Sequence, residues 1–335
     1  MSDSVRYGVV GVAGVGRLHA DIVEGVPDAT LVAGADHDEE TAADFAGKRE
    51  CGSYTDPGEM VTGADVDAVS VCTPSGTHAE VSIECLEAGA SVLCEKPLDV
   101  YRDRLDAMVA AADGADGTLA GVFQKRTFAE HQRAKRAIED GELGRIVLGT
   151  AHVKWYRSQE YYDSGDWRGT RALDGGCLLT QAIHHVDVLQ WLMGGVEGVY
   201  ASLDTVERDM ETENVAAITL AFDNGAIGTI EATTATRGGR SRIEVNGTRG
   251  SYNDGTFLTT EARPPIEYVP DEDREFGDAH VDVIRDFVSA VRHDRDPMVP
   301  VRDARRAVDI VLASYESAER DAWIDVDAFR NGAFE

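Results

Sequence analysis

The sequence predicts an α/β protein with two domains, an N-terminal doubly wound parallel sheet and a C-terminal α/β domain with a large, mostly antiparallel open sheet. Strands and helices alternate as far as residue 123, and a glycine-rich turn joins the first strand to the first helix. Beyond residue 123, strands follow one another with few helices between them. With 335 residues, 43% of them hydrophobic, the chain is long for one domain. We therefore expect domains at residues 1–123 and 124–335.

An apolar strand, a glycine-rich turn and a helix open the chain. Residues 7–11 form an apolar run that suits a central parallel strand buried on both faces, and residues 18–26 have the pattern of a helix. Between them, Gly11, Ala13 and Gly16 occupy the three defined positions of G-x-G-x-x-G. In this Rossmann motif the tight turn brings the pyrophosphate of a dinucleotide onto the helix N-terminus. The alanine at the second position is a departure of one methyl group.

A second strand at 30–35 ends on Asp36, 20 residues after Gly16. A carboxylate there accepts hydrogen bonds from the ribose hydroxyls and repels a 2′-phosphate. We therefore expect NAD to be preferred, with NADP possible. The alternative is that Asp36 simply starts a turn with His37 and Asp38.

The alternation continues with helices at 39–47, 79–88 and 101–112 and strands at 68–72, 91–94 and 118–123, with an acidic turn at 54–58. Two of these strands end in polar loops, residues 73–78 and Glu95-Lys96-Pro97. Both loops fall at the carboxyl edge of a parallel sheet, where ligands bind. Residues 73–78 also suit a helix-capping turn. Lys96 is one of only five lysines, and a lysine that ends a buried strand needs a partner or a function.

The pattern changes in the second half, where we expect strands at 146–156, 198–204, 215–222, 226–234, 242–246 and 250–253. Helices are expected at 131–140, 279–292 and 302–319, with a turn at 294–297. Because few helices separate these strands, the second sheet should be largely antiparallel.

One helix of the second domain carries candidate chemistry. Residues 174–194 enter a helix through two glycines and leave it through two more. Thr180, His184, Asp187 and Trp191 share a face at helical spacing, so a hydroxyl, an imidazole and a carboxylate could relay a proton. The alternative for His184 is a packed or surface histidine. A metal site with His185 is disfavoured, because adjacent histidines point in different directions on a helix.

Composition narrows the function classes. The net charge of −29 arises from 61 acidic and 32 basic residues dispersed along the chain. This is a solubility signature that favours a salt-rich cytoplasm, and it disfavours nucleic acid and anionic membranes as partners. The five cysteines show no C-x-x-C spacing, which is typical of a reduced compartment without a disulfide frame. We expect no targeting or transmembrane segment.

Taken together, the glycine loop, CTPSGTH at 72–78, EKP at 95–97 and GGCLLTQAIHHVD at 175–187 resemble the Gfo/Idh/MocA oxidoreductases, the family of glucose–fructose oxidoreductase and inositol dehydrogenase. The resemblance implies a Rossmann domain, a C-terminal sheet that forms homodimers or homotetramers, and a site between the domains. It also implies that Lys96 contacts substrate and nicotinamide and that His184 is the general acid/base. Thr180 departs from the aspartate that inositol dehydrogenase-like members carry there.

The resemblance, together with the loops above, implies two sets of site residues. The expected cofactor contacts are Gly11, Ala13, Gly14, Val15, Gly16, Arg17, Leu18, Asp36, Thr73, Pro74, Ser75, His78, Glu95, Lys96, Gln124, Trp167 and Arg168. The expected substrate contacts are Lys96, Tyr156, Arg157, Tyr162, Trp167, Arg168, Asp174, Thr180 and His184, with Lys96, His184 and Thr180 catalytic and no metal.

These residues predict hydride transfer between a nicotinamide and a secondary alcohol of a sugar, a sugar derivative or a cyclitol. The loop at 155–176 also resembles that of some nucleotide-sugar dehydrogenases, which leaves nucleotide sugars as an alternative substrate class. A non-catalytic NAD-binding sensor or scaffold of the same fold is the competing function.

Overall fold

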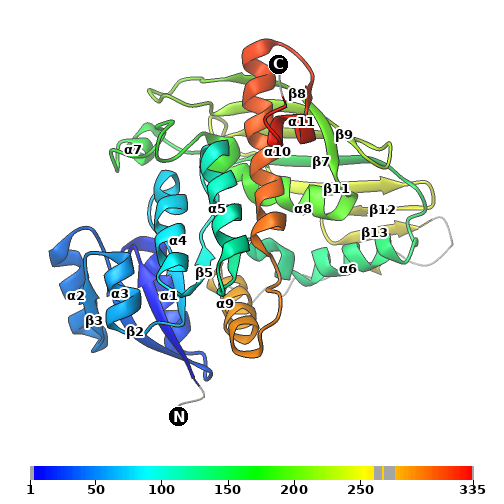
Figure 1. The fold of residues 1–335 in the computed structure, drawn as a ribbon. Helices are drawn as coiled ribbons and strands as arrows, with labels where there is room; N and C mark the ends of the chain where they lie inside the picture. The colour runs from blue at the N-terminus through cyan, green and yellow to red at the C-terminus, as the bar shows by residue number, and fades with distance from the viewer. Residues whose placement is uncertain (1–3, 260–265, 268–275, 334–335) are drawn as a thin grey trace. The chain divides into compact units, whose positions relative to one another are not determined.

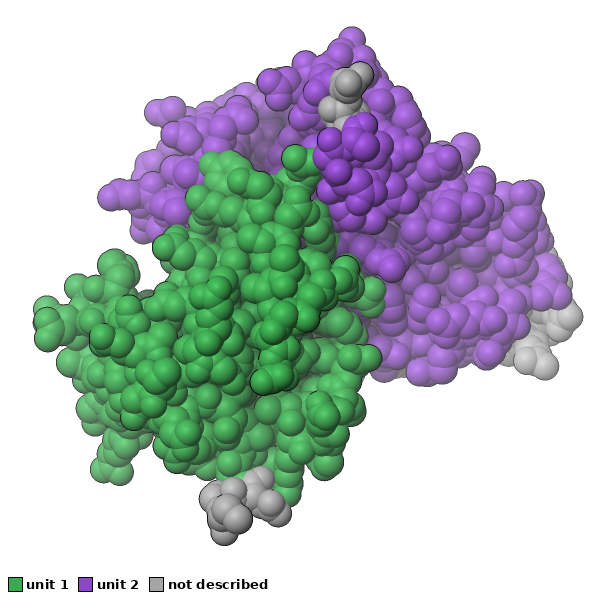
Figure 2. Space-filling model, in the orientation of Figure 1, with its two compact units in different colours: residues 1–124, 275–305 green, residues 125–274, 306–335 purple. Residues whose placement is uncertain are grey.

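The computed structural model of the protein describes residues 4–259, 266–267 and 276–333. The chain divides into two compact units (Figure 2): unit 1 comprises residues 1–124 and 275–305, and unit 2 comprises residues 125–274 and 306–335. This differs from the expected second domain of 124–335, because residues 275–305 return to unit 1. The reason is the helix α9 (Phe276–His293), whose Ile284 and Phe287 join one hydrophobic core with Val5 and Tyr7 of the first strand.

Unit 1 contains a six-stranded sheet in the order β3-β2-β1-β4-β5-β6, with every strand pairing parallel to its neighbours. Figure 1 labels β2, β3 and β5 of this sheet. Its strands are β1 (Val5–Val10), β2 (Ala29–Ala35), β3 (Gly52–Tyr54), β4 (Ala68–Val71), β5 (Ser91–Cys94) and β6 (Leu119–Gly121). Its helices are α1 (Gly14–Glu24), α2 (Glu39–Arg49), α3 (Pro57–Gly63), α4 (His78–Glu87) and α5 (Arg102–Gly114), with α9 from the tail. The predicted doubly wound sheet is confirmed, and the order is that of a Rossmann fold.

Two elements of unit 1 lie where the sequence indicated only a turn. The strand β3 and the helix α3 flank the acidic segment at 54–58. Asp56 caps α3 by accepting a hydrogen bond from the Glu59 N–H at 2.7 Å, and Pro57 occupies the first helical turn. Both elements are short, so their periodicity is weak.

Unit 2 contains a nine-stranded sheet in the order β14-β13-β12-β11-β7-β10-β9-β8-β15. Its strands are β7 (Ile146–Lys154), β8 (Val196–Asp204), β9 (Val215–Phe222), β10 (Ile227–Thr233), β11 (Arg242–Gly247), β12 (Gly250–Asn253), β13 (Thr256–Thr259), β14 (Ile266–Glu267) and β15 (Ile324–Asp325). The pair β7–β10 is parallel and the other pairs are antiparallel. The predicted mostly antiparallel sheet is therefore confirmed.

The helices of unit 2 are α6 (Ala129–Glu139), α7 (Gln159–Tyr162), α8 (Ile183–Met193), α11 (Val326–Arg330) and most of α10 (Val301–Arg320), whose residues 301–305 belong to unit 1. The helix α8 packs closely on β7, since a Cβ added at Gly149 would meet the Met193 sulfur at 1.8 Å. Among the described helices, none combines the length and apolar character that crossing a membrane requires.

Candidate functional site

The glycine loop between β1 and α1 is built for close approach. Gly11 has φ +81° and lies so close to the residue after β4 that an added Cβ would be 2.7 Å from the carbonyl of Cys72. A Cβ at Gly16 would lie 1.9 Å from the Gly11 oxygen, so both positions require glycine. A Cβ at Gly14, by contrast, would have no neighbour within 4 Å.

The helix α1 begins at Gly14, four residues earlier than the sequence indicated. Its N-cap, Ala13, makes no side-chain hydrogen bond to the first turn. The first N–H groups of a helix have no partner within it and carry partial positive charge. An uncapped helix start beside open space fits the pyrophosphate of a dinucleotide.

Asp36 lies at the end of β2, beside this loop. Its carboxylate accepts hydrogen bonds from the N–H groups of Val12 and Asp38, both at 3.2 Å, and its Oδ1 is 3.0 Å from the His37 Nδ1. The bond to Asp38 is of the kind that a turn-forming aspartate makes. The bond to Val12 ties the same carboxylate to the glycine loop. Asp36 therefore makes the turn contact and also stands next to the dinucleotide loop.

His78, expected to contact the cofactor, is buried instead. Its Nδ1 and Nε2 each lie 2.7 Å from a carbonyl oxygen, those of Pro97 and Thr73. The pKa of the imidazole is lowered, because the effect of burial outweighs the opposing effects of the two carbonyls and of Glu95 and Asp99. Because both ring nitrogens are occupied, His78 joins two strand-end loops of unit 1 and does not present a nitrogen to a ligand.

Glu95, also expected to contact the cofactor, is buried at the end of β5. It accepts the N–H of Lys96 at 3.0 Å, and its other oxygen faces His19 at 3.1 Å and His280 at 3.7 Å. Burial opposes ionisation of Glu95, but the hydrogen bonds and charges of the two histidines hold its pKa well below the usual range. Lys96 itself is partly exposed at this edge. Neither histidine was among the predicted site residues.

The helix expected at 174–194 is two segments. Residues Leu178–Ala182 form a π-helical turn, and α8 continues from Ile183 to Met193, where Gly194 with φ +107° ends it. Thr180 and His184 are both partly exposed, and the Thr180 hydroxyl donates to the Gly176 carbonyl at 2.8 Å. π turns are rare and are often found at functional sites.

Asp187, which shares a helix face with His184, is bound by a residue from another segment. Its carboxylate is fully buried and accepts two hydrogen bonds from Arg126, at 2.8 and 2.5 Å. The guanidinium also lies over the Trp191 ring, 5.6 Å from its centroid. Spacing along one helix could not reveal this partner, because Arg126 lies on another segment.

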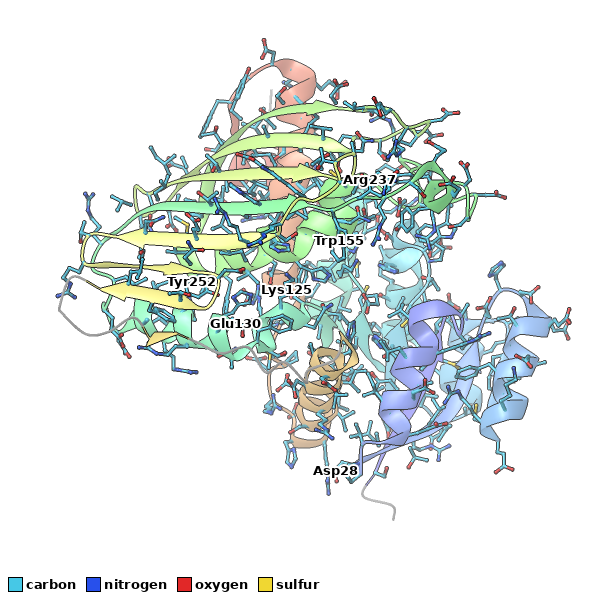
Figure 3. The ribbon with its side chains drawn as sticks, turned by 180° about the vertical axis from the view of Figure 1, so that it is seen from behind. Asp28, Lys125, Glu130, Trp155, Arg237 and Tyr252 are labelled. Atoms are coloured by element: carbon cyan, nitrogen blue, oxygen red, sulfur yellow. The ribbon has the colours of Figure 1, made fainter. Side chains whose placement is uncertain are left out.

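His185 is likewise engaged, with its Nε2 3.0 Å from the Nζ of Lys125. Lys125 is labelled in Figure 3. Burial lowers the pKa of Lys125 to about 8, and burial together with Lys125 holds the pKa of His185 well below its usual range. A metal site built on His184, His185 and Asp187 would therefore have to displace two existing contacts. Lys125 and Arg126 were passed over in the sequence, where they look like ordinary surface residues after a strand.

Aromatic rings and guanidinium groups alternate in the loop after β7. Arg168 lies between Tyr161 and Trp167, with its Cζ 4.5 and 4.4 Å from the ring centroids. Arg157 lies over Trp155 at 5.0 Å and over Tyr161 at 4.7 Å. The Nε atoms of both arginines are buried and have no hydrogen-bond partner among the described residues. Unpartnered buried donors of this kind are suited to a ligand.

Tyr156 and Arg237 extend this surface. The Cζ of Arg237 is 3.7 Å from the Tyr156 centroid, and Arg208 lies over the same ring at 5.4 Å. Two expected substrate residues, Tyr162 and Asp174, are instead buried in the loop. The Tyr162 hydroxyl is 2.8 Å from the Thr234 hydroxyl, and the Asp174 carboxylate accepts the Gly169 N–H at 2.6 Å. We assign these two side chains to the support of the loop.

Glu213 was also missed, since it lies far along the chain from the helix that it holds. Its Oε1 accepts the Leu178 N–H at 2.8 Å and the Tyr315 hydroxyl at 3.2 Å. A Cβ on Gly176 would lie 1.6 Å from its Oε2, which explains one glycine of the helix entry. Burial raises the pKa of Glu213 to about 7.

The remaining expected cofactor residues lie on α1, after β4, at the end of unit 1 and in the loop after β7. On α1, Arg17 is exposed, and Val15 and Leu18 are partly exposed. After β4, Pro74 is exposed, Thr73 is partly exposed and Ser75 is buried. Gln124 is buried at the end of unit 1. Trp167 and Arg168 belong to unit 2.

Comparison with known proteins agrees with this geometry. A family model described as an oxidoreductase family with an NAD-binding Rossmann fold matches residues 5–122, and the model of the GFO/IDH/MocA C-terminal domain matches residues 131–253. The myo-inositol 2-dehydrogenase of Thermotoga maritima is 28% identical over 333 residues, covering 94% of this chain and 96% of that protein.

Two further similar proteins are associated by name or by bound ligand with other compounds. The levoglucosan dehydrogenase of Pseudarthrobacter phenanthrenivorans is 26% identical over 327 residues, covering 82% of this chain and 83% of that protein. The WlbA dehydrogenase of Bordetella pertussis, solved in complex with NADH and UDP-GlcNAcA, is 31% identical with a TM-score of 0.85, covering 96% of this chain and 98% of that one. The protein described here therefore belongs to the Gfo/Idh/MocA family of oxidoreductases and is an NAD-binding dehydrogenase of that family.

Proposed function

We propose that the protein oxidises a secondary alcohol of a sugar, a sugar derivative or a cyclitol, with NAD as the hydride acceptor. The observation that carries this proposal is the location of Lys96, at the carboxyl edge of the sheet that also bears the glycine loop and Asp36. A cation at that edge can act on the oxygen of a substrate that meets the nicotinamide. The names of the relatives above support the substrate class.

In the proposed reaction, bound NAD supplies the acceptor for the hydride. His184 accepts the hydroxyl proton as the C–H bond breaks, and the Lys96 ammonium stabilises the negative charge that develops on the oxygen. The Thr180 hydroxyl orients the imidazole or the substrate. The aromatic and arginine surface around Arg157 and Arg168 binds the rest of the polyol.

A substrate panel tests this function. Purified protein should be incubated in high salt with NAD or NADP and with pentoses, hexoses, inositols and anhydrosugars, and NADH formation should be followed by absorbance. We expect turnover with NAD for at least one polyol. Tight NAD binding without turnover of any compound would contradict an enzyme and favour the sensor or scaffold.

A specific observation favours anionic sugars as a second substrate class. Arg157, Arg168, Arg208 and Arg237 gather around aromatic rings in a protein whose net charge is −29. Guanidinium groups recognise carboxylate and phosphate oxygens, so this surface suits a nucleotide sugar or a uronic acid. A UDP-sugar included in the panel decides this. If neutral sugars turn over and UDP-sugars do not, a nucleotide sugar as substrate is refuted.

We further propose that the protein works as a homodimer or homotetramer through the sheet of unit 2. Leu148 of β7 and Ile227 of β10 are register partners, and their side chains are exposed by 44% and 55%. Tyr200 and Leu258 are exposed on other strands of the same sheet. Sedimentation at several protein concentrations tests the assembly, and Ile227→Asp should weaken it. A monomer at all concentrations refutes it.

We also propose a salt-rich cytoplasm as the working environment, from the charge of −29 and the five lysines. High salt shortens the range of repulsion between surface carboxylates. Activity that is highest in dilute buffer and falls steadily with added salt would contradict this setting.

A further inference from the structure

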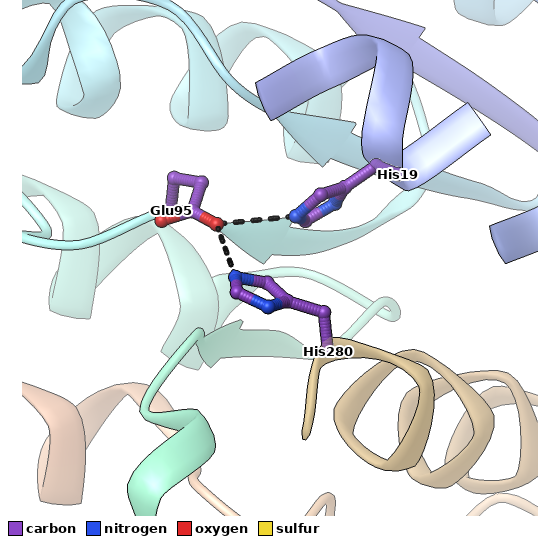
Figure 4. A group of neighbouring side chains, drawn as sticks. All are labelled: His19, Glu95 and His280. Carbon is purple, nitrogen blue, oxygen red and sulfur yellow. Dashed lines mark hydrogen bonds and ion pairs between the residues drawn. The ribbon is translucent and has the colours of Figure 1, made fainter. Parts of the chain in front are cut away.

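A buried charged cluster in unit 1 has no role in the reaction described above. Glu95, at the end of β5, directs one carboxylate oxygen toward two histidines (Figure 4). These are His19 of α1 and His280 of α9. The three side chains are exposed by at most 8%. The two imidazole rings also contact each other edge to face, with centroids 5.9 Å apart.

Hydrogen bonds continue from this cluster to the core of the sheet. The His19 Nδ1 is 2.8 Å from the Ser70 hydroxyl, which is 2.8 Å from the Tyr7 hydroxyl. One arrangement of protons satisfies all three hydrogen bonds. In it the Tyr7 hydroxyl donates to the Ser70 hydroxyl, which donates to the His19 Nδ1, and the His19 Nε2–H donates to Glu95. Burial raises the pKa of Tyr7, so the phenol keeps the proton that this row needs.

The anchored carboxylate in turn holds the backbone of the next residue. The second oxygen of Glu95 accepts the Lys96 N–H at 3.0 Å. On the other side of the lysine, the Pro97 carbonyl is bonded to the buried His78. The peptide that carries Lys96 is therefore restrained on both flanks by buried histidines.

A buried carboxylate is costly, and a well-packed apolar cluster of equal volume is often as stable or more stable. Packing by itself does not explain an ionised group at this position. We propose that Glu95, held by His19 and His280, is a positioning residue for Lys96. It fixes the peptide from which the ammonium reaches the substrate oxygen, and this rests on the function proposed above for Lys96.

The same three side chains have donor types that a zinc ion accepts. However, the hydrogen bonds described above already occupy both oxygens of Glu95 and both nitrogens of His19. A metal would have to break the bond between His19 and Glu95 in a site with almost no exposure. The geometry therefore favours a hydrogen-bonded cluster of His19, Glu95 and His280, and zinc binding is one outcome that the test can detect.

The test uses Glu95→Gln and the pair His280→Leu and His280→Gln in the full-length protein. His280 is on α9 and is not one of the expected cofactor contacts, so its removal should affect cofactor binding less than turnover. We expect kcat to fall by roughly 10- to 100-fold in Glu95→Gln and His280→Leu, the loss that misplacing a reacting group by about 1 Å can cause. NADH affinity should change much less. His280→Gln keeps a donor and should recover much of kcat.

Hydrogen exchange of the Lys96 amide gives a second readout that does not need turnover. The amide should be protected in the wild type and should exchange faster in Glu95→Gln and His280→Leu. His293→Gln, an exposed position on the same helix, serves as the matched control and should match the wild type in both measurements.

Three results would overturn the proposal. The first is that kcat and the exchange rate of the Lys96 amide are unchanged in the variants. The second is that kcat falls only as much as NADH affinity and melting temperature fall. The third is that the protein contains stoichiometric zinc and loses activity when a chelator removes it. If the wild type turns over no compound, the proposed function fails separately. Amide exchange then still shows whether the cluster of His19, Glu95 and His280 restrains the Lys96 backbone.

Discussion

Replacing Glu213 with glutamine should make the protein more stable at neutral pH and should change how stability depends on pH. The carboxyl group is buried, and its pKa rises from an ordinary 4.5 to about 7. Between these two values the folded state keeps a proton that the unfolded state has lost. Stability from this group is therefore fully present below about pH 4.5 and is lost as the pH rises to about 7.

The size of the effect follows from the difference between the two pKa values. At about 1.4 kcal/mol per pH unit, the loss amounts to roughly 3 kcal/mol. The glutamine side chain of the variant stays neutral at every pH, and its amide oxygen can still accept the Leu178 N–H. Glu213→Gln should therefore gain up to roughly 3 kcal/mol over the wild type at pH 8, and the gain should shrink toward pH 5.

The assay is denaturant unfolding at half-unit steps from pH 5 to pH 8.5 at one salt concentration, and the free energies of unfolding of the two proteins are compared. Glu197→Gln removes an exposed glutamate of β8 and controls for the change in net charge. A difference between Glu213→Gln and the wild type that does not vary with pH would refute the reasoning. Variation of the same size in Glu197→Gln would refute it as well.

Three further predictions concern the cofactor, the salt dependence and the chemistry. Asp36→Ala should weaken NAD binding by roughly 10- to 100-fold, the value of a hydrogen bond to a charged group, and should relax discrimination against NADP. Equal use of both cofactors by the wild type would contradict it. The melting temperature should rise from dilute to molar salt, because screening shortens from about 10 Å to about 3 Å, and no rise would leave the acidic composition unexplained. Lys96→Met and His184→Ala should each lower kcat by roughly 10²–10⁴-fold, non-additively in the double variant, with Thr180→Ala less affected. Near wild-type turnover in His184→Ala would contradict the acid/base role of His184 and indicate that it only packs in the structure.

Local pattern by itself determined most of the fold. Strand β5 at Ser91–Cys94, β9 at Val215–Phe222 and β12 at Gly250–Asn253 have the predicted bounds, because apolar alternation and flanking turn residues are local signals. The glycine loop could be read for the same reason, since its backbone needs specific residues at fixed spacing. Short elements such as β3 and α3 left too few residues for a period to appear.

Only the tertiary structure decided which side chains are available to a ligand. Asp187 and His78 have the residue types of a site, yet Arg126 and two carbonyl groups occupy them. Glu213 and His280 are remote in sequence from the helix and the strand end that they hold. Burial and partners that are distant in sequence change the pKa and the free hydrogen-bonding atoms of an ionisable group. The spacing of residues along one segment predicts neither of them.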